Sequence, residues 1–316
     1  MGEKEEALEK ARTVIVEISN MLGEMVKPEA KILDLAEKIE AFIESKEAMW
    51  AFPVNICIGS TAAHYTPNLG EDTCIPHDDI VKMDFGVAVD GYALDKAVSL
   101  YFGDDEDKKT MIATAQEALE KAITSIRPGL SYTDVAWTVY DYVKSRGFNV
   151  IKNLHGHKIE RWKLHLDEIP IHPEIKTHGA FEEGAIYAIE IFVTDGNGFA
   201  ETLEDARIYS LPSILADVRG RIKIPIHVKS AREVFGWIWR NRRTLPFSLR
   251  HLKKVFDETT IKVALAILER NGLIERYNVL REVKGTVAQA EETILVKRSG
   301  VEILTRAKKL EVSKNL

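Results

Sequence analysis

Residues 80–102, IVKMDFGVAVDGYALDKAVSLYF, predict a β-hairpin that carries two aspartates on one face. The Asp90-Gly91 dipeptide between two apolar runs is a strong signal for a two-residue turn. Such a turn fixes the register, which pairs Val89 with Tyr92, Gly86 with Asp95 and Asp84 with Ala97. Asp84 and Asp95 then become diagonal neighbours, with Cα atoms about 7–8 Å apart.

The two aspartates predict either a metal site or a local structural role. Two carboxylates at this separation can reach a shared pair of metal ions about 3.5–4 Å apart. Strands disfavour aspartate, and a buried unpaired charge is costly, so the pair requires an explanation. The alternative is that each aspartate caps a turn or forms a salt bridge, and this segment alone leaves both interpretations open.

Composition and charge indicate an ordinary globular protein. The chain has 316 residues, 45% hydrophobic and 29% charged, and its net charge of -6 argues against general nucleic-acid binding. No apolar run reaches the length of a membrane span, and the acidic N-terminal segment does not resemble a signal peptide. Two cysteines, Cys57 and Cys74, are too few for a disulfide framework. We therefore expect a cytoplasmic protein. These features do not determine the oligomeric state, for which we expect a monomer.

Hydrophobic periodicity predicts helices followed by strands, twice over. The predicted helices span residues 5–26, 28–46, 108–125 and 133–145, and the predicted strands span 54–58, 80–90, 92–102, 148–152, 185–194 and 286–297. This repeat of architecture indicates an α+β domain in which helices back a sheet. We expect the domain to comprise residues 1–205 and 277–316, with an inserted subdomain at 206–276.

The predicted insert is helical and rich in basic residues. Three helices, at 230–240, 248–255 and 260–270, followed by a short end, resemble a winged helix. Between Arg219 and Lys254 there are eleven Lys and Arg residues and one acidic residue, Glu233. This stretch is either a solvated basic surface or a contact with RNA, for example on a ribosome.

Histidines and isolated glutamates add candidate ligands. Seven of the nine histidines fall between residues 64 and 178, although a single histidine is more often structural than a ligand. Glu190 lies in the apolar segment YAIEIFV, and Glu291 lies in TVAQAEETILV, which could also form a solvent-facing edge strand. Two aspartates, one histidine and two glutamates would suit a dinuclear hydrolase better than a structural zinc site.

Five segments in order resemble the motifs of methionine aminopeptidases. They are AAHYTPN (62–68), VKMDFGVAVDGYALDKAV (81–98), GHKIERWKLH (156–165), AIEIFVT (188–194) and VAQAEETILV (287–296). The insert with TLPF (244–247) looks like that of the type II branch, and the chain resembles its archaeal members. The resemblance implies the pita-bread (creatinase/aminopeptidase) fold and removal of N-terminal methionine from nascent proteins.

The resemblance also implies roles for individual residues. It makes Asp84, Asp95, His157, Glu190 and Glu291 ligands of two divalent ions (Co, Mn, Fe or Zn), with Asp95 and Glu291 bridging both. Glu190 would also accept a proton during catalysis, and His64 and His165 match two active-site histidines that contact the substrate. Phe52 and His178 match residues of the methionine pocket. The implied substrates are peptides and nascent chains that begin with methionine.

Some positions depart from the family pattern. Lys158, Ile191, Ala290 and Glu292 replace the usual residues beside three of the ligands, and His155 and Trp162 are smaller departures. Lys158 would place a cation beside the metals, and Glu292 would add negative charge around them. Two rival functions stay open: another hydrolase of the same fold, such as a proline dipeptidase, and a non-catalytic relative that binds RNA or ribosomes.

Overall fold

The structure is a computed structural model that describes residues 2–218 and 226–307. Part of the predicted basic stretch, residues 219–225, lies outside the described residues. Among the helices that are described, none is long and apolar enough to cross a membrane.

The helix–strand repeat predicted from the sequence is present, with its two copies offset by one hundred residues. The first copy contains α1 (Glu3–Met25), α2 (Ile32–Ser45), β1 (Met49–Trp50), β2 (Asn55–Ile58), β3 (Thr61–Ala63), β4 (Val81–Val89) and β5 (Tyr92–Leu100). The second contains α3 (Glu106–Ser125), α4 (Tyr132–Ser145), β6 (Asn149–Val150), β7 (His155–Ile159), β8 (Glu168–Pro170) and β9 (Ile186–Thr194). The helix α4 and the strand β6 repeat α2 and β1 at the same spacing, which gives the fold its pseudo-twofold character.

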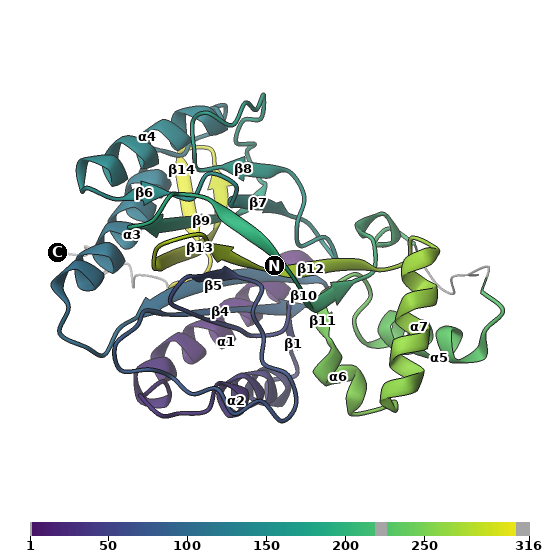
Figure 1. Cartoon of the computed structure of the whole chain (residues 1–316). Helices are drawn as coiled ribbons and strands as arrows, with labels where there is room; N and C mark the ends of the chain where they lie inside the picture. Colours follow the sequence, from purple (N-terminus) through teal and green to yellow (C-terminus); the bar gives the residue numbers. More distant parts are fainter. Residues whose placement is uncertain (1, 219–225, 308–316) are drawn as a thin grey trace, which may run out of the picture.

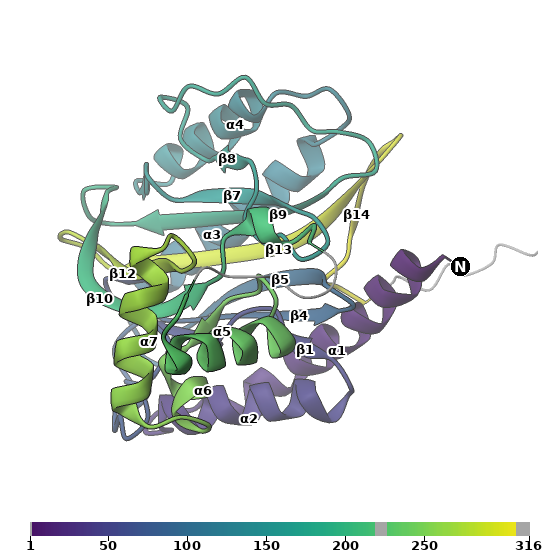
Figure 2. The ribbon, with the colours of Figure 1, turned by 90° about the vertical axis from the view of Figure 1, so that its right-hand side faces the viewer.

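A ten-stranded sheet joins the two copies. Its main path runs β1-β4-β5-β13-β9-β7-β8, so that β13 (Val287–Lys297) is the strand that joins β5 of the first copy to β9 of the second. The short strands β2, β6 and β14 (Gly300–Ile303) pair with β4, β9 and β13. The helix pairs α1–α2 and α3–α4 pack against the sheet, and the insert helices project to one side (Figures 1 and 2).

Alternation along the strands separates the core from the site. On β4, Met83, Phe85 and Val87 are fully buried in the cluster that contains the apolar faces of α1 and α2. Asp84 points to the opposite face, because successive side chains of a strand alternate. The helix α1 turns one face to this cluster, since Leu8, Ala11, Ile15, Ile18 and Leu22 are all buried. The helices therefore cover one face and leave the other to the carboxylates.

A smaller, four-stranded sheet carries the insert. Its order is β11-β10-β12-β3, and its two long strands, β10 (Ala200–Ser210) and β12 (Glu275–Glu282), are antiparallel. Between them lie η1 (Ser213–Leu215), α5 (Lys229–Asn241), β11 (Phe247–Ser248), α6 (Leu249–Lys253) and α7 (Glu258–Arg270). Three of these helices match the predicted ones, whereas β10 and β12 were not predicted because charged residues interrupt their alternation.

A buried ion cluster fastens the insert to the first helix pair. The guanidinium of Arg250, fully buried, donates to both oxygens of Glu40 on α2, and His251 contacts the same carboxylate at 3.0 Å. Burial raises the pKa of Glu40, but hydrogen bonds from His251 and Arg250 outweigh it and bring that pKa to about 2. The prediction of a wholly solvated basic stretch is thus wrong for Arg250, and also for Arg242, which is 3% exposed.

We expect Arg250→Met to lower the free energy of unfolding by about 3–5 kcal/mol, because it leaves a buried carboxylate without its cation. The low pKa of Glu40 stabilises the wild type above pH 4.5, and that stabilisation is lost as the pH falls toward 2. In the variant the hydrogen bond from His251 stays but those from Arg250 are lost, so this pKa rises above its wild-type value, and the loss should be larger at pH 7 than at pH 4. Urea unfolding at both pH values measures it. An equal loss of unfolding free energy at both pH values would contradict the assigned ion pair. The double variant Arg250→Met with Glu40→Leu should recover most of the stability.

Candidate metal centre

The β4–β5 hairpin has the predicted register. Val89 pairs with Tyr92, Gly86 with Asp95 and Asp84 with Ala97. Asp90 and Gly91 both have positive φ, 51° and 83°, as a two-residue turn of this kind requires. Gly86 has a further role, since a Cβ there would lie 2.6 Å from Cε1 of Phe52. Glycine at this position lets the Phe52 ring lie directly against the strand that carries Asp84.

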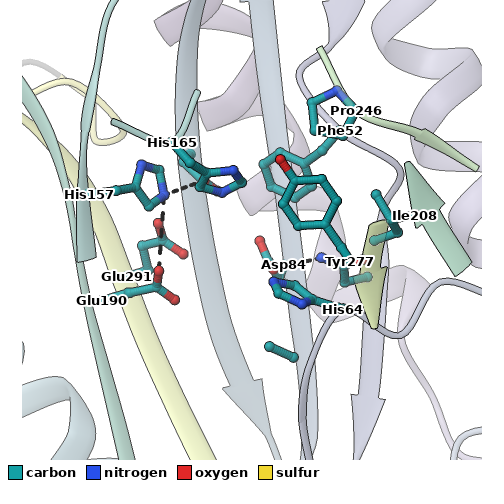
Figure 3. Close-up of a pocket in the computed structure, with 13 residues that line it drawn as sticks. Phe52, His64, Asp84, His157, His165, Glu190, Ile208, Pro246, Tyr277 and Glu291 are labelled. Atoms are coloured by element: carbon teal, nitrogen blue, oxygen red, sulfur yellow. Dashed lines mark hydrogen bonds and ion pairs between the residues drawn. The ribbon is translucent and has the colours of Figure 1, made fainter. Parts of the chain in front are cut away.

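Strands from both copies bring the five predicted ligands to one pocket (Figure 3). Glu291 of β13 faces Ala97 of β5 on one side and Glu190 of β9 on the other. His157 of β7 places Nε2 3.5 Å from Asp95 Oδ2 and 4.0 Å from Glu190 Oε1. Because β13 is flanked by β5 and β9, the alternative of a solvent-facing edge strand is wrong.

The pocket concentrates negative charge without basic side chains to balance it. Its lining contains Asp84, Asp95, Glu190 and Glu291, and no Lys or Arg from the described parts of the chain. Burial raises the pKa of Asp95 to about 8. Burial, and then the negative charge of Asp95, raise the pKa values of Asp84, Glu190 and Glu291 as well. In water-excluded surroundings such a cluster must take up either protons or cations.

The chemistry of these donors fits divalent metal ions. One ligand atom each from Asp95, His157 and Glu291 lie within 4.8 Å of one another, and all three residues are buried. Buried oxygens of Asp84, Asp95 and Glu291 have no hydrogen-bond partner among the described residues. Burial lowers the pKa of His157 to about 4, so its imidazole is neutral and its lone pair is free to bind a metal.

Two further histidines line the pocket. His64 has φ 65°, and its Nδ1 lies 3.1 Å from the carbonyl oxygen of Asn278. A carbonyl only accepts, so Nδ1 carries the proton and Nε2 is left as an acceptor. The ring of His165 meets that of His157 edge-on at 4.4 Å. Burial, followed by the neighbouring His157 and His64, holds the pKa of His165 well below its usual value.

The remaining lining is mostly apolar, and the sequence analysis found only part of it. Phe52 was predicted, whereas Ile208, Pro246 and Tyr277 were not, because they lie on β10, before β11 and on β12. Ile208 and Tyr277 are direct cross-strand partners. A signal for Pro246 was present in the TLPF segment. The structure does not bring His178 to this pocket, since its side chain is exposed in the loop between β8 and β9.

The expected consequence of Lys158 is wrong, and that of Glu292 is reduced to the smallest of the effects that raise the pKa of Glu291. Lys158 does not lie beside the ligands, because it follows His157 on β7, points to the other face and pairs with Glu182 at 2.8 Å. Glu292 also lies on the far face, where its carboxylate binds Lys96 at 2.6 Å and Arg306 at 2.7 Å. Its negative charge is therefore compensated by two basic side chains.

Comparison with known proteins agrees with this geometry. Residues 5–229 match metallopeptidase family M24. A protein named methionine aminopeptidase from Thermococcus kodakarensis is 39% identical over 306 residues, which cover 96% of this chain and 100% of the relative. The chain belongs to metallopeptidase family M24.

Solved structures related to this M24 chain share its fold. A thermophilic Arx1 matches with a TM-score of 0.79 at 16% identity, covering 96% of this chain and 91% of that one. The methionine aminopeptidase of Thermotoga maritima matches with a TM-score of 0.69 at 21% identity, covering 97% and 98%. The M24 chain therefore has the pita-bread fold expected from its sequence.

Loading the metal-free M24 chain with Mn²⁺ at pH 7 should release protons, because the raised pKa values of the four carboxyls leave protons to displace. A carboxyl whose pKa is raised by folding stabilises the protein at low pH and loses that effect as the pH rises, here through about 8 for Asp95. The increase in Tm on metal addition should therefore be larger at pH 8 than at pH 6. Calorimetry in buffers of different ionisation enthalpy counts the protons. Metal binding without proton release would contradict a protonated carboxylate cluster. The Asp95→Asn variant should release fewer protons than the wild type.

Proposed function

We propose that this chain hydrolyses the peptide bond after an N-terminal methionine, using two divalent ions held by Asp84, Asp95, His157, Glu190 and Glu291. The proposal rests on one observation: a cluster of carboxylates and an apolar wall lie side by side in the same buried pocket. The 39% sequence identity to a protein named methionine aminopeptidase supports methionine removal as the reaction.

All five side chains would serve as ligands: Asp84, Asp95, Glu190 and Glu291 through carboxylate oxygens and His157 through an imidazole nitrogen. Co, Mn, Fe and Zn all suit this mixture of oxygen donors and one imidazole. When bound, the ions would supply Lewis acidity, which lowers the pKa of water toward neutrality and polarises the substrate carbonyl.

The contacts of Glu190 support a role in proton transfer. Gln289 donates to its Oε2 at 3.3 Å, which orients the carboxylate and leaves Oε1 on the side of His157. We assign Glu190 as the base that takes the proton of the water attacking the carbonyl after methionine. The same carboxyl would return a proton to the departing amine.

The two histidines have complementary roles in the proposal. Since Nδ1 of His64 donates to the Asn278 carbonyl, its Nε2 can accept the N–H of the scissile amide. His165 is neutral at pH 7 and can donate one N–H to the carbonyl oxygen as negative charge develops there. Both rings lie near the Tyr277 ring, at 5.5 Å and 5.6 Å, which limits their movement.

The apolar wall favours methionine over other residues. Phe52, Ile208, Pro246 and Tyr277 offer a surface that an unbranched thioether side chain can fill. A proline dipeptidase of the same fold is the alternative among hydrolases. A substrate with proline in second place tests it directly.

Location and partners are also proposals. We propose that the protein acts in the cytoplasm as a monomer on nascent chains. A ribosome contact would involve the exposed side of α5, where Lys229, Arg232, Arg240 and Trp237 line a shallow hollow. The burial of Arg242 and Arg250 removes two arginines from this surface and leaves a smaller basic patch.

Metal-stripped protein refilled with Mn²⁺ or Co²⁺ should release methionine from the peptide Met-Ala-Ser, and Asp84→Ala should abolish release. Amino-acid analysis of the products measures both. No release from folded, metal-loaded wild type would overturn the proposed reaction. Hydrolysis of the dipeptide Met-Pro without release from Met-Ala-Ser would instead favour the dipeptidase alternative.

His165→Ala should lower kcat by about 10²–10³, the usual cost of removing one donor to a developing oxyanion. KM should change much less, because the methionine side chain contacts other residues. Steady-state kinetics separates the two effects, and metal analysis confirms that the site is still filled. An unchanged kcat would remove His165 from the mechanism.

A further inference from the structure

Arg242 is a buried arginine whose partners are backbone carbonyls. It follows the last residue of α5 and is 3% exposed. Its guanidinium donates to the oxygens of Trp50 at 2.6 Å, Ala51 at 3.2 Å and Pro246 at 3.0 Å. Within residues 2–218 and 226–307, no carboxylate forms an ion pair with it inside 4.0 Å. A cation in this position is costly to bury, since no carboxylate contacts it, and Glu40 and Glu44 favour its charge only from a distance.

The Trp50 ring provides the other contact. The guanidinium carbon lies 3.3 Å from the ring centroid, a close cation–π arrangement. The same ring stacks on His251 at 4.1 Å, which belongs to the ion cluster with Glu40 and Arg250. Burial lowers the pKa of Arg242 to about 9, so the guanidinium is still charged at neutral pH. Its position is therefore fixed by several contacts at once.

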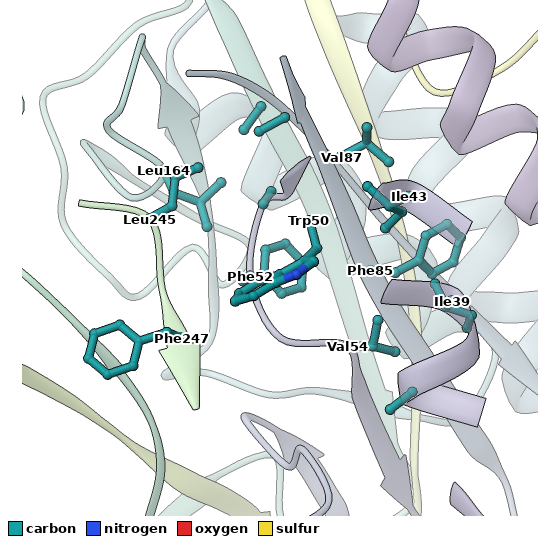
Figure 4. Packing of buried hydrophobic residues seen from close by; sticks show 14 of the residues in the cluster. Ile39, Ile43, Trp50, Phe52, Val54, Phe85, Val87, Leu164, Leu245 and Phe247 are labelled. Atoms are coloured by element: carbon teal, nitrogen blue, oxygen red, sulfur yellow. The ribbon is translucent and has the colours of Figure 1, made fainter. Parts of the chain in front are cut away.

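These carbonyls belong to two separate segments, each of which contributes a residue to the pocket lining. Trp50 and Ala51 directly precede Phe52, which comes from the first helix–strand copy. Pro246 comes from the insert and lines the pocket itself. Figure 4 shows the first-copy residues Trp50 and Phe52 in one apolar cluster with Leu245 and Phe247 of the insert. A single guanidinium thus joins the two segments that carry Phe52 and Pro246.

We propose that Arg242 is a positioning residue that sets the width of the methionine pocket and so its selectivity for the N-terminal residue. The inference deepens the proposed function and rests on it. Arg242 does not touch the ligands or the reacting bond. Its fork of donors holds the backbone before Phe52 at a fixed distance from the backbone of Pro246, and the planar group has a geometry that lysine cannot reproduce.

Selectivity should depend on the distance between the Phe52 and Pro246 segments, because an apolar pocket distinguishes substrates by how closely their side chains fit. One methylene group in such a pocket is worth about 10–200-fold in kcat/KM. Without the hydrogen bonds from Arg242, the wall formed by Phe52 and Pro246 would relax. It would then lose contact with the methionine side chain and admit branched residues. The carboxylates lie on other strands and would keep their positions. The change should therefore appear in substrate binding and not in the chemical step.

The test compares Arg242→Gln, Arg242→Lys and a matched control, Arg270→Gln, which removes an exposed arginine at the end of α7 in the same insert. Each metal-loaded variant is assayed on Met-Ala-Ser and Leu-Ala-Ser. For Arg242→Gln we expect the KM for Met-Ala-Ser to rise about 10-fold, kcat to stay within about 3-fold, and the preference for Met over Leu to fall about 10-fold. Arg270→Gln should match the wild type.

A second measurement does not require turnover. Calorimetry with free L-methionine as the probe should show weaker binding to both Arg242 variants by a similar factor. If the wild type binds L-methionine but hydrolyses neither peptide, the proposed function fails while the effect of Arg242 on binding can still be scored. Arg242→Lys keeps the charge and serves if Arg242→Gln does not fold.

Two results would overturn the inference. One is a folded Arg242 variant with the wild-type KM, Met-over-Leu ratio and L-methionine affinity. The other is a fall in kcat and thermal stability with unchanged selectivity, which would show that Arg242 only supports the fold. Metal content measured on each variant excludes indirect loss of the ions as the cause.

Discussion

Four carboxylates lie in one buried pocket, and no basic side chain of the described residues neutralises their charge. The rest of the structure is arranged around the repulsion between these carboxylates. Acidic groups from four adjacent strands converge only because β13 is paired on both sides, which brings Glu291 opposite both Ala97 and Glu190. A fifth strand adds His157 in its neutral form. Unpaired oxygens on three of the carboxylates are what a metal site needs and what a purely structural cluster would avoid.

Much of this could be predicted from sequence because local rules were sufficient. The Asp90-Gly91 turn fixes the hairpin register, so the relative positions of Asp84 and Asp95 followed from counting. Glu190 stood out as a charge inside an apolar strand. That it faces Glu291 could not be counted in the same way, since the whole insert lies between the two strands and no turn links them.

Other features could not be predicted from the sequence, because they depend on residues far away along the chain. Composition could not distinguish a buried arginine from a solvated one, and the carboxylate that binds Arg250 is 210 residues away along the chain. The far-face positions of Lys158 and Glu292 required the strands to be placed first. Ile208 and Tyr277 reach the pocket on two strands whose charged residues hid their alternation. The insert therefore contributes the pocket wall that local sequence patterns describe least well.

The position of β13 in the sheet has a consequence for biosynthesis. Ribosomes make a chain from its N-terminus, so the strands on either side of β13, and the whole insert, are complete before residues 287–297 are available. Until then β5 and β9 each have an unpaired edge, and strand edges of that kind invite intermolecular pairing. Closing the sheet also requires contacts of long sequence separation, which form slowly. A nascent copy of this protein is thus most exposed to aggregation immediately before the strand that completes its metal centre is in place.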